Sequence, residues 1–173
     1  EPRSCYPSGK RAAETLCCSY SQQYGLDVVI ARPCHTYGPN MSDRDNRATA
    51  QFIRNALKGE DIILKSAGNQ MRSYCYVADC VSALLTILLN GAPREAYNIA
   101  NKDSRLTIAE FARLVAEFSG RNVVFENPDL TALQERSPIE RQVLDSRKIE
   151  SLGWVGNYPA EKGIEHTLKI LNV

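Results

Sequence analysis

The sequence predicts an α/β protein in which part of a parallel sheet near the N-terminus is followed by a smaller mixed lobe. Segments with helical spacing of apolar residues alternate with short apolar runs along the chain, an alternation typical of α/β folds. The run Asp27-Val-Val-Ile-Ala-Arg32 is rich in β-branched residues and follows a helical segment, as expected of a buried parallel strand. A chain of 173 residues is long enough to bury a core of its own.

The N-terminal elements are a helix and the strand that it feeds. Apolar residues recur every three or four positions from Pro7 to Tyr24, so we expect a helix with one buried face. Gly25 follows at once and is a typical C-terminal stop. Beyond the strand at 27–32, Pro33 and the pair Gly38-Pro39 predict a loop.

The middle of the chain predicts a series of short elements: a helix at 48–57, a strand at 61–65, a turn at 68–70, a strand at 72–77, a helix at 80–89 and a strand at 96–100. The segment 72–77 alternates polar and apolar residues, which indicates a half-exposed strand. Asp79 precedes the apolar helix, so we expect it to act as the N-cap rather than as a catalytic acid.

The last third of the chain predicts mostly helices. Thr107 and Glu110 form a capping-box pattern, which places the start of a helix that runs from 108 to 118. The later elements are expected as a strand at 123–125, a loop at 127–138, a helix near 146–152 and a final helix at 160–171.

Composition excludes several classes of function. Lys and Arg (21) balance Asp and Glu (20), so bulk charge indicates neither a nucleic-acid nor a membrane partner. No apolar run is long enough to span a bilayer. The six cysteines show no C-x-x-C pairing and lie in apolar surroundings, which predicts buried free thiols and a cytoplasmic protein. His35 and His166 are the only imidazoles and neither stands at ligand spacing, so we expect no metal site.

The chemistry of the N-terminal helix lies in Tyr6 and Lys10, which are four residues apart. One helical turn places both side chains on one face. An ammonium close to a phenol favours the phenolate, so the pair can supply a general base. The same spacing also fits an ordinary surface helix that begins near Pro7.

A second cluster follows the strand at 27–32. His35 and Thr36 stand just beyond its carboxyl end, where ligands bind in open α/β sheets, and both side chains can donate hydrogen bonds. The alternative is a structural turn in which Arg32 pairs with an internal carboxylate.

A third cluster consists of Arg72 and Arg141. Two guanidinium groups can bracket a diphosphate, because each matches phosphate oxygens with two parallel hydrogen bonds. The alternative is a solvated surface position, which is common for arginine. Trp154, in Leu-Gly-Trp, is expected to anchor a turn rather than to bind a ligand.

Six short motifs follow one another along the chain: Tyr6-x-x-x-Lys10, Arg32-x-x-His35-x-Tyr37-Gly38-Pro39, Arg72-Ser-Tyr-Cys-Tyr-Val-Ala-Asp79, Tyr97-Asn-Ile-Ala100, Asp145-x-x-Lys148 and Leu152-Gly-Trp154. Together they resemble the C-terminal half of the extended short-chain dehydrogenase/reductase family, whose NAD-dependent epimerases and dehydratases act on nucleotide sugars. The resemblance covers nearly the whole chain. It implies the C-terminal portion of a Rossmann-like fold at residues 1–40 and a mainly substrate-binding lobe at 41–173.

The resemblance also implies roles for individual residues. In that family the tyrosinate removes a proton from a sugar hydroxyl while NAD accepts hydride, and the lysine holds the nicotinamide ribose. The expected catalytic residues are therefore Tyr6 and Lys10. The expected cofactor contacts are Tyr6, Lys10, Pro33 and His35, and the expected contacts with a nucleotide-diphosphate sugar are His35, Thr36, Arg72 and Arg141.

Two departures from the family pattern limit the implied function. His35 stands where relatives usually carry Asn, and the ten glycines form no glycine-rich phosphate-binding turn. We therefore expect a fragment that lacks half of the NAD site and does not by itself reduce NAD.

The parent enzyme resembles the dTDP-glucose 4,6-dehydratases most, with UDP-glucuronate decarboxylase and UDP-sugar 4-epimerase as alternatives. A further alternative is a catalytically inert fragment that binds nucleotide sugar or only self-associates, for example as a homodimer, to cover an open sheet edge.

Overall fold

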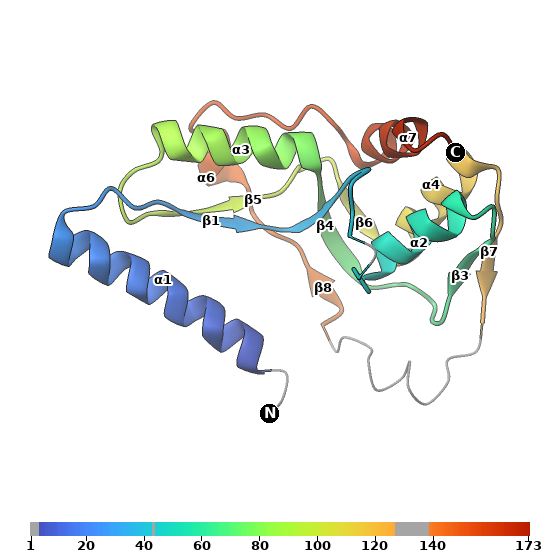
Figure 1. Ribbon diagram of the computed structural model, residues 1–173, viewed down its shortest axis with the longest axis horizontal. Coiled ribbons are helices and arrows are strands. Elements are labelled where there is room, and N and C mark those ends of the chain that lie inside the picture. The colour runs from blue at the N-terminus through green and yellow to red at the C-terminus, as the bar shows by residue number, and fades with distance from the viewer. Residues whose placement is uncertain (1–3, 43, 127–138) are drawn as a thin grey trace.

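The structure is a computed structural model and describes residues 4–42, 44–126 and 139–173. Its α/β alternation agrees with the sequence prediction (Figure 1). The helices are α1 (Cys5–Tyr24), α2 (Ala48–Leu57), α3 (Val77–Asn90), α4 (Ile108–Ser119), α6 (Arg147–Glu150) and α7 (Ala160–Ile170). The strands are β1 (Ile30–Pro33), β2 (His35–Tyr37), β3 (Ile62–Leu64), β4 (Met71–Tyr76), β5 (Ala96–Ile99), β6 (Arg105–Thr107), β7 (Val123–Phe125) and β8 (Arg141–Gln142).

The strands pair mostly in parallel. β1 pairs with β5, with Ile30 opposite Ala96, and β3 pairs with β7. β4 is the common strand of the remaining sheet, because β2 and β8 pair with it in parallel and β6 pairs with it antiparallel. The expected parallel pair near the N-terminus is therefore present, but its second strand comes from much later in the chain.

β4 is more buried than its sequence pattern predicts. The alternation at 72–77 indicates a half-exposed strand, yet every residue from Arg72 to Tyr76 is buried. The prediction was wrong because β4 has strands along its edges and a hydrophobic core against each face. Tyr74 and Tyr76 enter one core, whereas Cys75, pointing the opposite way, enters the other.

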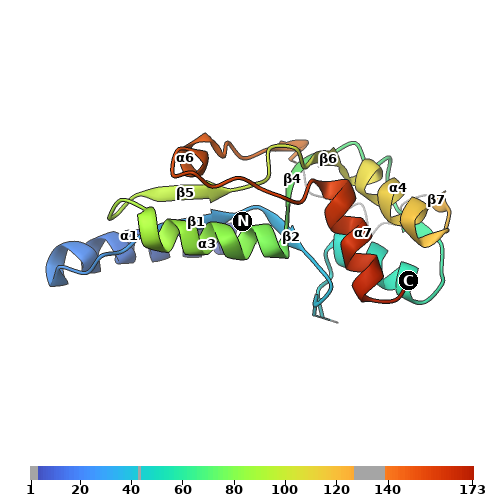
Figure 2. The ribbon, with the colours of Figure 1, turned by 90° about the horizontal axis from the view of Figure 1, so that it is seen from above.

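Two hydrophobic cores thus meet at β4, and the elongated outline in Figure 2 reflects this arrangement. The first core lies among α2, α4 and α7 and is centred on aromatic residues such as Phe52 and Phe111. The second lies beneath α3 and contains Ile87, Ile99 and Trp154. Trp154 is an anchor, as expected: it is 4% exposed and its indole N–H donates to the Ser82 hydroxyl (3.0 Å).

The ends of α4 follow the sequence signals. The Thr107 hydroxyl accepts from the Glu110 N–H, and the Glu110 carboxylate accepts from the Thr107 N–H, so the predicted capping box is formed. Gly120 ends the helix with φ of 66°, a left-handed conformation that glycine adopts without strain. Caps of this kind stabilise a helix by about 1 kcal/mol.

α1 is less buried than the sequence predicts. It has the expected length, but Ser21 is its only buried residue, and Leu16 and Tyr20 are more than half exposed. Figure 1 shows the helix standing apart from the other layers. The prediction of a buried face was wrong. Within the described residues, no element packs along the side of α1 that contains its apolar residues. The strand that follows is also shorter and more exposed than the predicted 27–32.

α3 begins three residues earlier than predicted, and Asp79 is not its N-cap. The Asp79 carboxylate instead accepts hydrogen bonds from the backbone N–H groups of Asn157 (2.9 Å) and Tyr158 (3.0 Å) and from the Asn101 amide (3.2 Å). It is 2% exposed. This buried carboxylate therefore ties the segment before α7 to the start of α3.

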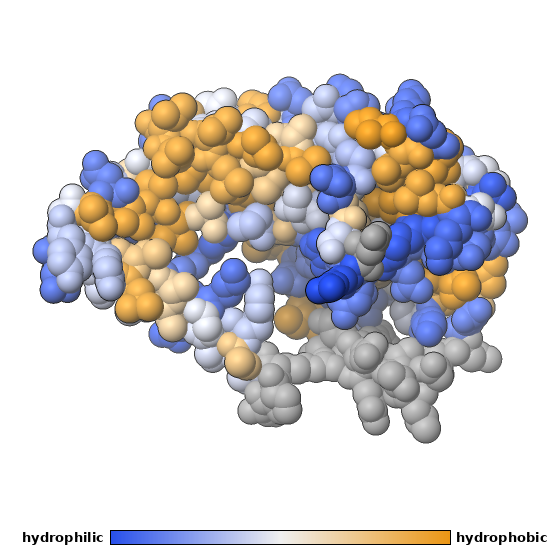
Figure 3. Space-filling view, viewed as in Figure 1, coloured by the Kyte–Doolittle hydropathy of each residue, from blue (hydrophilic) through white to orange (hydrophobic). Residues whose placement is uncertain are grey.

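The outer face of α3 is apolar and exposed. The residues that form it are Val81, Leu84, Leu85, Leu88 and Leu89. Figure 3 shows this face as a continuous hydrophobic band. Apolar patches of this kind are uncommon on isolated domains.

Short strands account for most of the elements that the sequence did not predict. β2, β6 and β8 have two or three residues each and form by pairing with β4, so no local periodicity marks them. The predicted loop at 127–138 lies outside the described residues.

The prediction that the cysteines are buried is correct only in part. Cys75 and Cys80 are buried free thiols, but Cys5 is exposed and the other three are intermediate. Within the described ranges, no group of three or more His, Cys, Asp or Glu residues could hold a metal ion. No helix there has the length and apolar character needed to cross a membrane.

The Asp79 contacts predict a large loss of stability on substitution. Asp79→Ala should lower the free energy of unfolding by about 3 kcal/mol, because it leaves buried N–H donors without an acceptor. Urea denaturation measures the change. Asp103→Ala, at an exposed carboxylate, is the control and should change the free energy by less than about 0.5 kcal/mol. Equal losses in the two variants would contradict the role given to Asp79.

Candidate functional site

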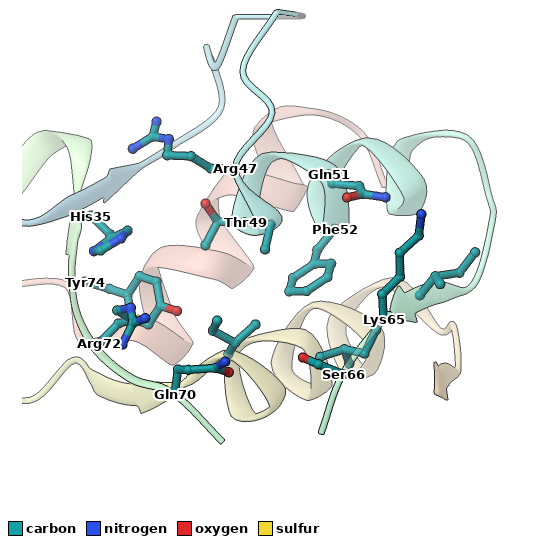
Figure 4. Close-up of a pocket in the computed structure, with 14 residues that line it drawn as sticks. His35, Arg47, Thr49, Gln51, Phe52, Lys65, Ser66, Gln70, Arg72 and Tyr74 are labelled. Atoms are coloured by element: carbon teal, nitrogen blue, oxygen red, sulfur yellow. The ribbon is translucent and has the colours of Figure 1, made fainter. Parts of the chain in front are cut away.

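A pocket of about 440 Å³ lies between α2, β3 and the start of β4 (Figure 4). One part of its lining is polar and the other is apolar. The lining residues are His35, Arg47, Ala48, Thr49, Gln51, Phe52, Ile63, Leu64, Lys65, Ser66, Gln70, Arg72, Tyr74 and Ile108. The volume suits a small molecule of the size of a nucleotide.

The charges of the pocket have one sign. Arg47, Lys65 and Arg72 line it, and no Asp or Glu of the described residues does. Several cations around a concave surface without a lining carboxylate attract anions. The pocket is therefore suited to a phosphate-bearing or other anionic ligand.

Arg72 lines this pocket, but most of its donors are engaged within the protein. It is 4% exposed, and its guanidinium donates to the backbone carbonyls of Met71 (2.8 Å), Ile139 (2.8 Å) and Glu140 (3.3 Å). The side chain thus holds the segment entering β8 against β4. Its charge contributes to the field of the pocket even though few donors remain for a ligand.

Arg47 stands at the start of α2 and pairs with Asp45 at 2.5 Å. The hydrogen bonds that it donates to the Asp45 carboxylate are the largest cause of its raised pKa, and the nearby Tyr6 hydroxyl is a smaller electrostatic cause. Tyr6 belongs to α1, whereas Arg47 lines the pocket. Tyr6 therefore contributes to the electrostatic surroundings of a residue that lines the pocket.

His35 and Thr36, the two site residues predicted after the first strand, point to opposite sides of β2 because side chains alternate along a strand. The His35 ring faces the pocket, where burial chiefly, and then the charges of Arg72 and Arg47, lower its pKa. The Thr36 hydroxyl lies on the other side and donates to the Cys34 carbonyl (3.3 Å) and to the Cys80 sulfur (3.6 Å). His35 therefore lines the pocket with a lowered pKa, and Thr36 is outside the pocket lining.

Tyr6 and Lys10 share one face of α1, as their spacing predicts. The Lys10 ammonium lies 5.5 Å from the centroid of the Tyr6 ring, and Tyr6 is 74% exposed. α1 runs back along β1 (Figure 1), so its N-terminal turn lies toward the carboxyl end of that strand. Pro33, the last residue of β1, is exposed at the same end. This is the end where open α/β sheets bind ligands.

The remaining predicted positions have structural contacts. Arg32 pairs with Glu14 of α1 at 2.5 Å, which is the structural alternative considered for it. Arg141 is exposed on β8 opposite Met71 and is outside the pocket lining. Lys148 pairs with Glu95 at 2.5 Å.

Sequence reasoning missed several residues of the pocket. Lys65 and Ser66 follow β3, and the position after a parallel strand is a recognisable signal for a site. Arg47 precedes α2 and Gln70 precedes β4, but nothing in the local sequence indicates that they face one cavity. Their proximity depends on the packing of α2 over β3 and β4.

Comparison with known proteins identifies related chains. UDP-glucuronic acid decarboxylase 1 of Xenopus tropicalis is 36% identical over 170 residues, covering 96% of this chain and 38% of that protein. The dTDP-D-glucose 4,6-dehydratase of Mus musculus is 31% identical over 172 residues, covering 98% of this chain and 48% of that protein. The chain thus spans less than half the length of these relatives.

Solved structures have the same fold. UDP-glucose 4-epimerase of Thermus thermophilus, in complex with NAD, matches with a TM-score of 0.81 and 27% identity, covering 96% of this chain and 53% of that one. UDP-glucose 4-epimerase of Thermotoga maritima, with UDP-glucose, matches with a TM-score of 0.81 and 25% identity, covering 94% and 52%. The Rossmann-like fold class expected from the sequence is confirmed.

A model of the NAD dependent epimerase/dehydratase family matches residues 1–100 of this chain. That segment is more than half of the 173 residues and contains the tyrosine and lysine of α1 as well as most of the residues that line the pocket. The chain belongs to the NAD dependent epimerase/dehydratase family.

Proposed function

We propose that this chain supplies the tyrosine and lysine pair and the nucleotide-sugar pocket of an NAD-dependent enzyme that oxidises a sugar at its 4-position. The observation that carries the proposal is the cationic pocket, in whose described lining no carboxylate stands and whose Arg47 lies close enough to Tyr6 to interact electrostatically with it. A nucleotide sugar joins an anionic diphosphate to a sugar with hydroxyl groups. It can therefore meet the pocket and the general base together.

Tyr6 acts as the general base in this proposal. Its side chain is 74% exposed on the first turns of α1, so its oxygen is available to take the proton of the sugar 4-hydroxyl. The Lys10 ammonium lies over the Tyr6 ring on the same face of the helix, 5.5 Å from the ring centroid. NAD, when bound, accepts the hydride from the sugar carbon.

The residues placed to contact NAD suit its nicotinamide end only. Tyr6, Lys10 and Pro33 are exposed at the carboxyl end of β1, where they can contact a nicotinamide ribose, with His35 nearby on β2. The printed sequence contains no glycine-rich turn for the pyrophosphate. We therefore propose that turnover takes place in an enzyme that joins this chain to a dinucleotide-binding half, and that the chain alone binds nucleotide sugar without oxidising it.

The similarity favours a UDP-glucuronic acid decarboxylase among enzymes of this chemistry, since the relative of that name is 36% identical and the dTDP-glucose dehydratase 31%. The dTDP-glucose dehydratase is the second candidate, because a relative of that name is 31% identical over 172 residues.

The cationic pocket predicts which charges hold the nucleotide. Arg47→Gln in this chain should weaken UDP binding about tenfold, because it removes a guanidinium that can pair with the diphosphate. Isothermal titration calorimetry measures the dissociation constant. Lys58→Gln, at an exposed lysine outside the pocket lining, removes the same charge and should leave the constant unchanged. Equal weakening in both variants would indicate attraction by net charge only.

The general-base role predicts a loss of rate without a loss of affinity. In an enzyme that joins this chain to its dinucleotide-binding half, Tyr6→Phe should lower the rate of sugar oxidation by at least about a hundredfold and leave UDP affinity unchanged. NADH formation in a single turnover measures the rate. Tyr24→Phe, at an exposed tyrosine of the same helix, is the control. A Tyr6→Phe enzyme with unaltered oxidation would exclude the phenolate.

The choice of reaction is tested by the product. We expect the joined enzyme with NAD to release carbon dioxide from UDP-glucuronic acid and to leave dTDP-glucose unchanged. Mass spectrometry of the nucleotide sugars distinguishes loss of the carboxyl group from loss of water. Dehydration of dTDP-glucose, with no decarboxylation, would favour the second candidate.

A further inference from the structure

Gln70 differs from the other polar residues of the pocket because its side-chain oxygen has no partner among the described residues. The residue is 4% exposed, and its Oε1 is a buried acceptor without a hydrogen bond. Buried polar atoms are nearly always hydrogen-bonded, and an unpaired one is costly. Its own backbone is well held, since the Gln70 carbonyl accepts from the Ile108 N–H at 3.2 Å. The unpaired amide is therefore presented at a defined place in the pocket lining.

The missing partner must donate a hydrogen to Oε1. A diphosphate at neutral pH has only acceptor oxygens toward such a group, so it cannot satisfy Gln70. Arg72 does not supply it, since Figure 4 shows the Gln70 amide extending away from Arg72 toward Ser66, and the Lys65 side chain extends away from Ser66 toward Gln51. The group that Gln70 meets is thus a part of the ligand other than the phosphates.

The position of Gln70 indicates which part. On the proposed function, the sugar lies near Tyr6, whose turn of α1 lies toward the carboxyl end of β1 (Figure 1). Phe52, Ile63 and Leu64 give the pocket its apolar surface, and Lys65 and Ser66 also line the pocket. The Gln70 amide points toward Ser66 (Figure 4). A flat nucleobase suits this apolar part, while the diphosphate lies between it and the sugar.

We propose that the Gln70 amide is a specificity-determining group that hydrogen-bonds to the imide edge of a uracil or thymine base. This inference rests on the proposed function and deepens it. Oε1 accepts from the imide N–H, and the amide NH₂ donates to the neighbouring base carbonyl.

The test compares UDP with N3-methyl-UDP, in which a methyl group replaces the imide hydrogen. The wild-type chain should bind UDP about tenfold more tightly than N3-methyl-UDP, as expected for one hydrogen bond. Gln70→Met, of similar shape, should bind UDP about tenfold more weakly and should no longer distinguish the two nucleotides. Gln22→Met, at an exposed glutamine of α1 outside the pocket lining, is the matched control and should keep the wild-type preference.

Stability gives a second readout. Gln70→Met removes an unpaired buried oxygen, so the melting temperature of the ligand-free chain should be unchanged or higher. A clear decrease would mean that the amide is a structural group and would overturn the proposal. Binding of inorganic pyrophosphate should be the same in wild type and Gln70→Met, because it has no base.

The outcomes separate this inference from the function on which it rests. If UDP binds and Gln70→Met keeps the wild-type preference for UDP over N3-methyl-UDP, Gln70 does not read the base, although the pocket still binds nucleotides. A ribose contact would give this result. If neither UDP nor dTDP binds the wild-type chain, the nucleotide-sugar function and the role of Gln70 both fail.

Discussion

The period-two alternation of β4 is the constraint that organises both halves of the molecule. Tyr74 and Tyr76 point into the core beneath α4 and α7, whereas Cys75 points into the core beneath α3. A shift of one residue would exchange these sets and bury side chains against the wrong helices. The same strand carries Arg72 to the pocket, so one register places both hydrophobic cores and the site beside the first of them.

The electrostatics of the site follow from this placement. Arg72 is buried because three backbone carbonyls accept its hydrogen bonds, which offsets much of the cost of removing its charge from water. Burial chiefly, and then the charges of Arg72 and Arg47, lower the pKa of His35. The pocket therefore combines positive potential with a neutral imidazole. This combination suits a ligand that has a diphosphate and uncharged hydroxyl or imide groups.

Exposed apolar surface marks the other end of the molecule. The outer face of α3 and the stripe along α1 contain leucine and tyrosine side chains that contact solvent in this chain. These faces flank β1, which pairs on one edge with β5. The tyrosine and lysine pair lies on the same helix as one of these faces, so whatever covers α1 in a longer enzyme will also influence the position of the proposed base.

Several features follow from local signals in the sequence alone. The capping box of Thr107 and Glu110, the stop at Gly120 and the four-residue spacing of Tyr6 and Lys10 are properties of neighbouring residues, and the structure has all three as predicted. Contacts between distant segments depend instead on tertiary packing. The residues before α2 and β4 enter one pocket because α2 packs over β3 and β4, and the buried carboxylate of α3 holds the segment before α7 instead of capping its own helix. Such contacts join residues far apart in sequence, and no local periodicity specifies them.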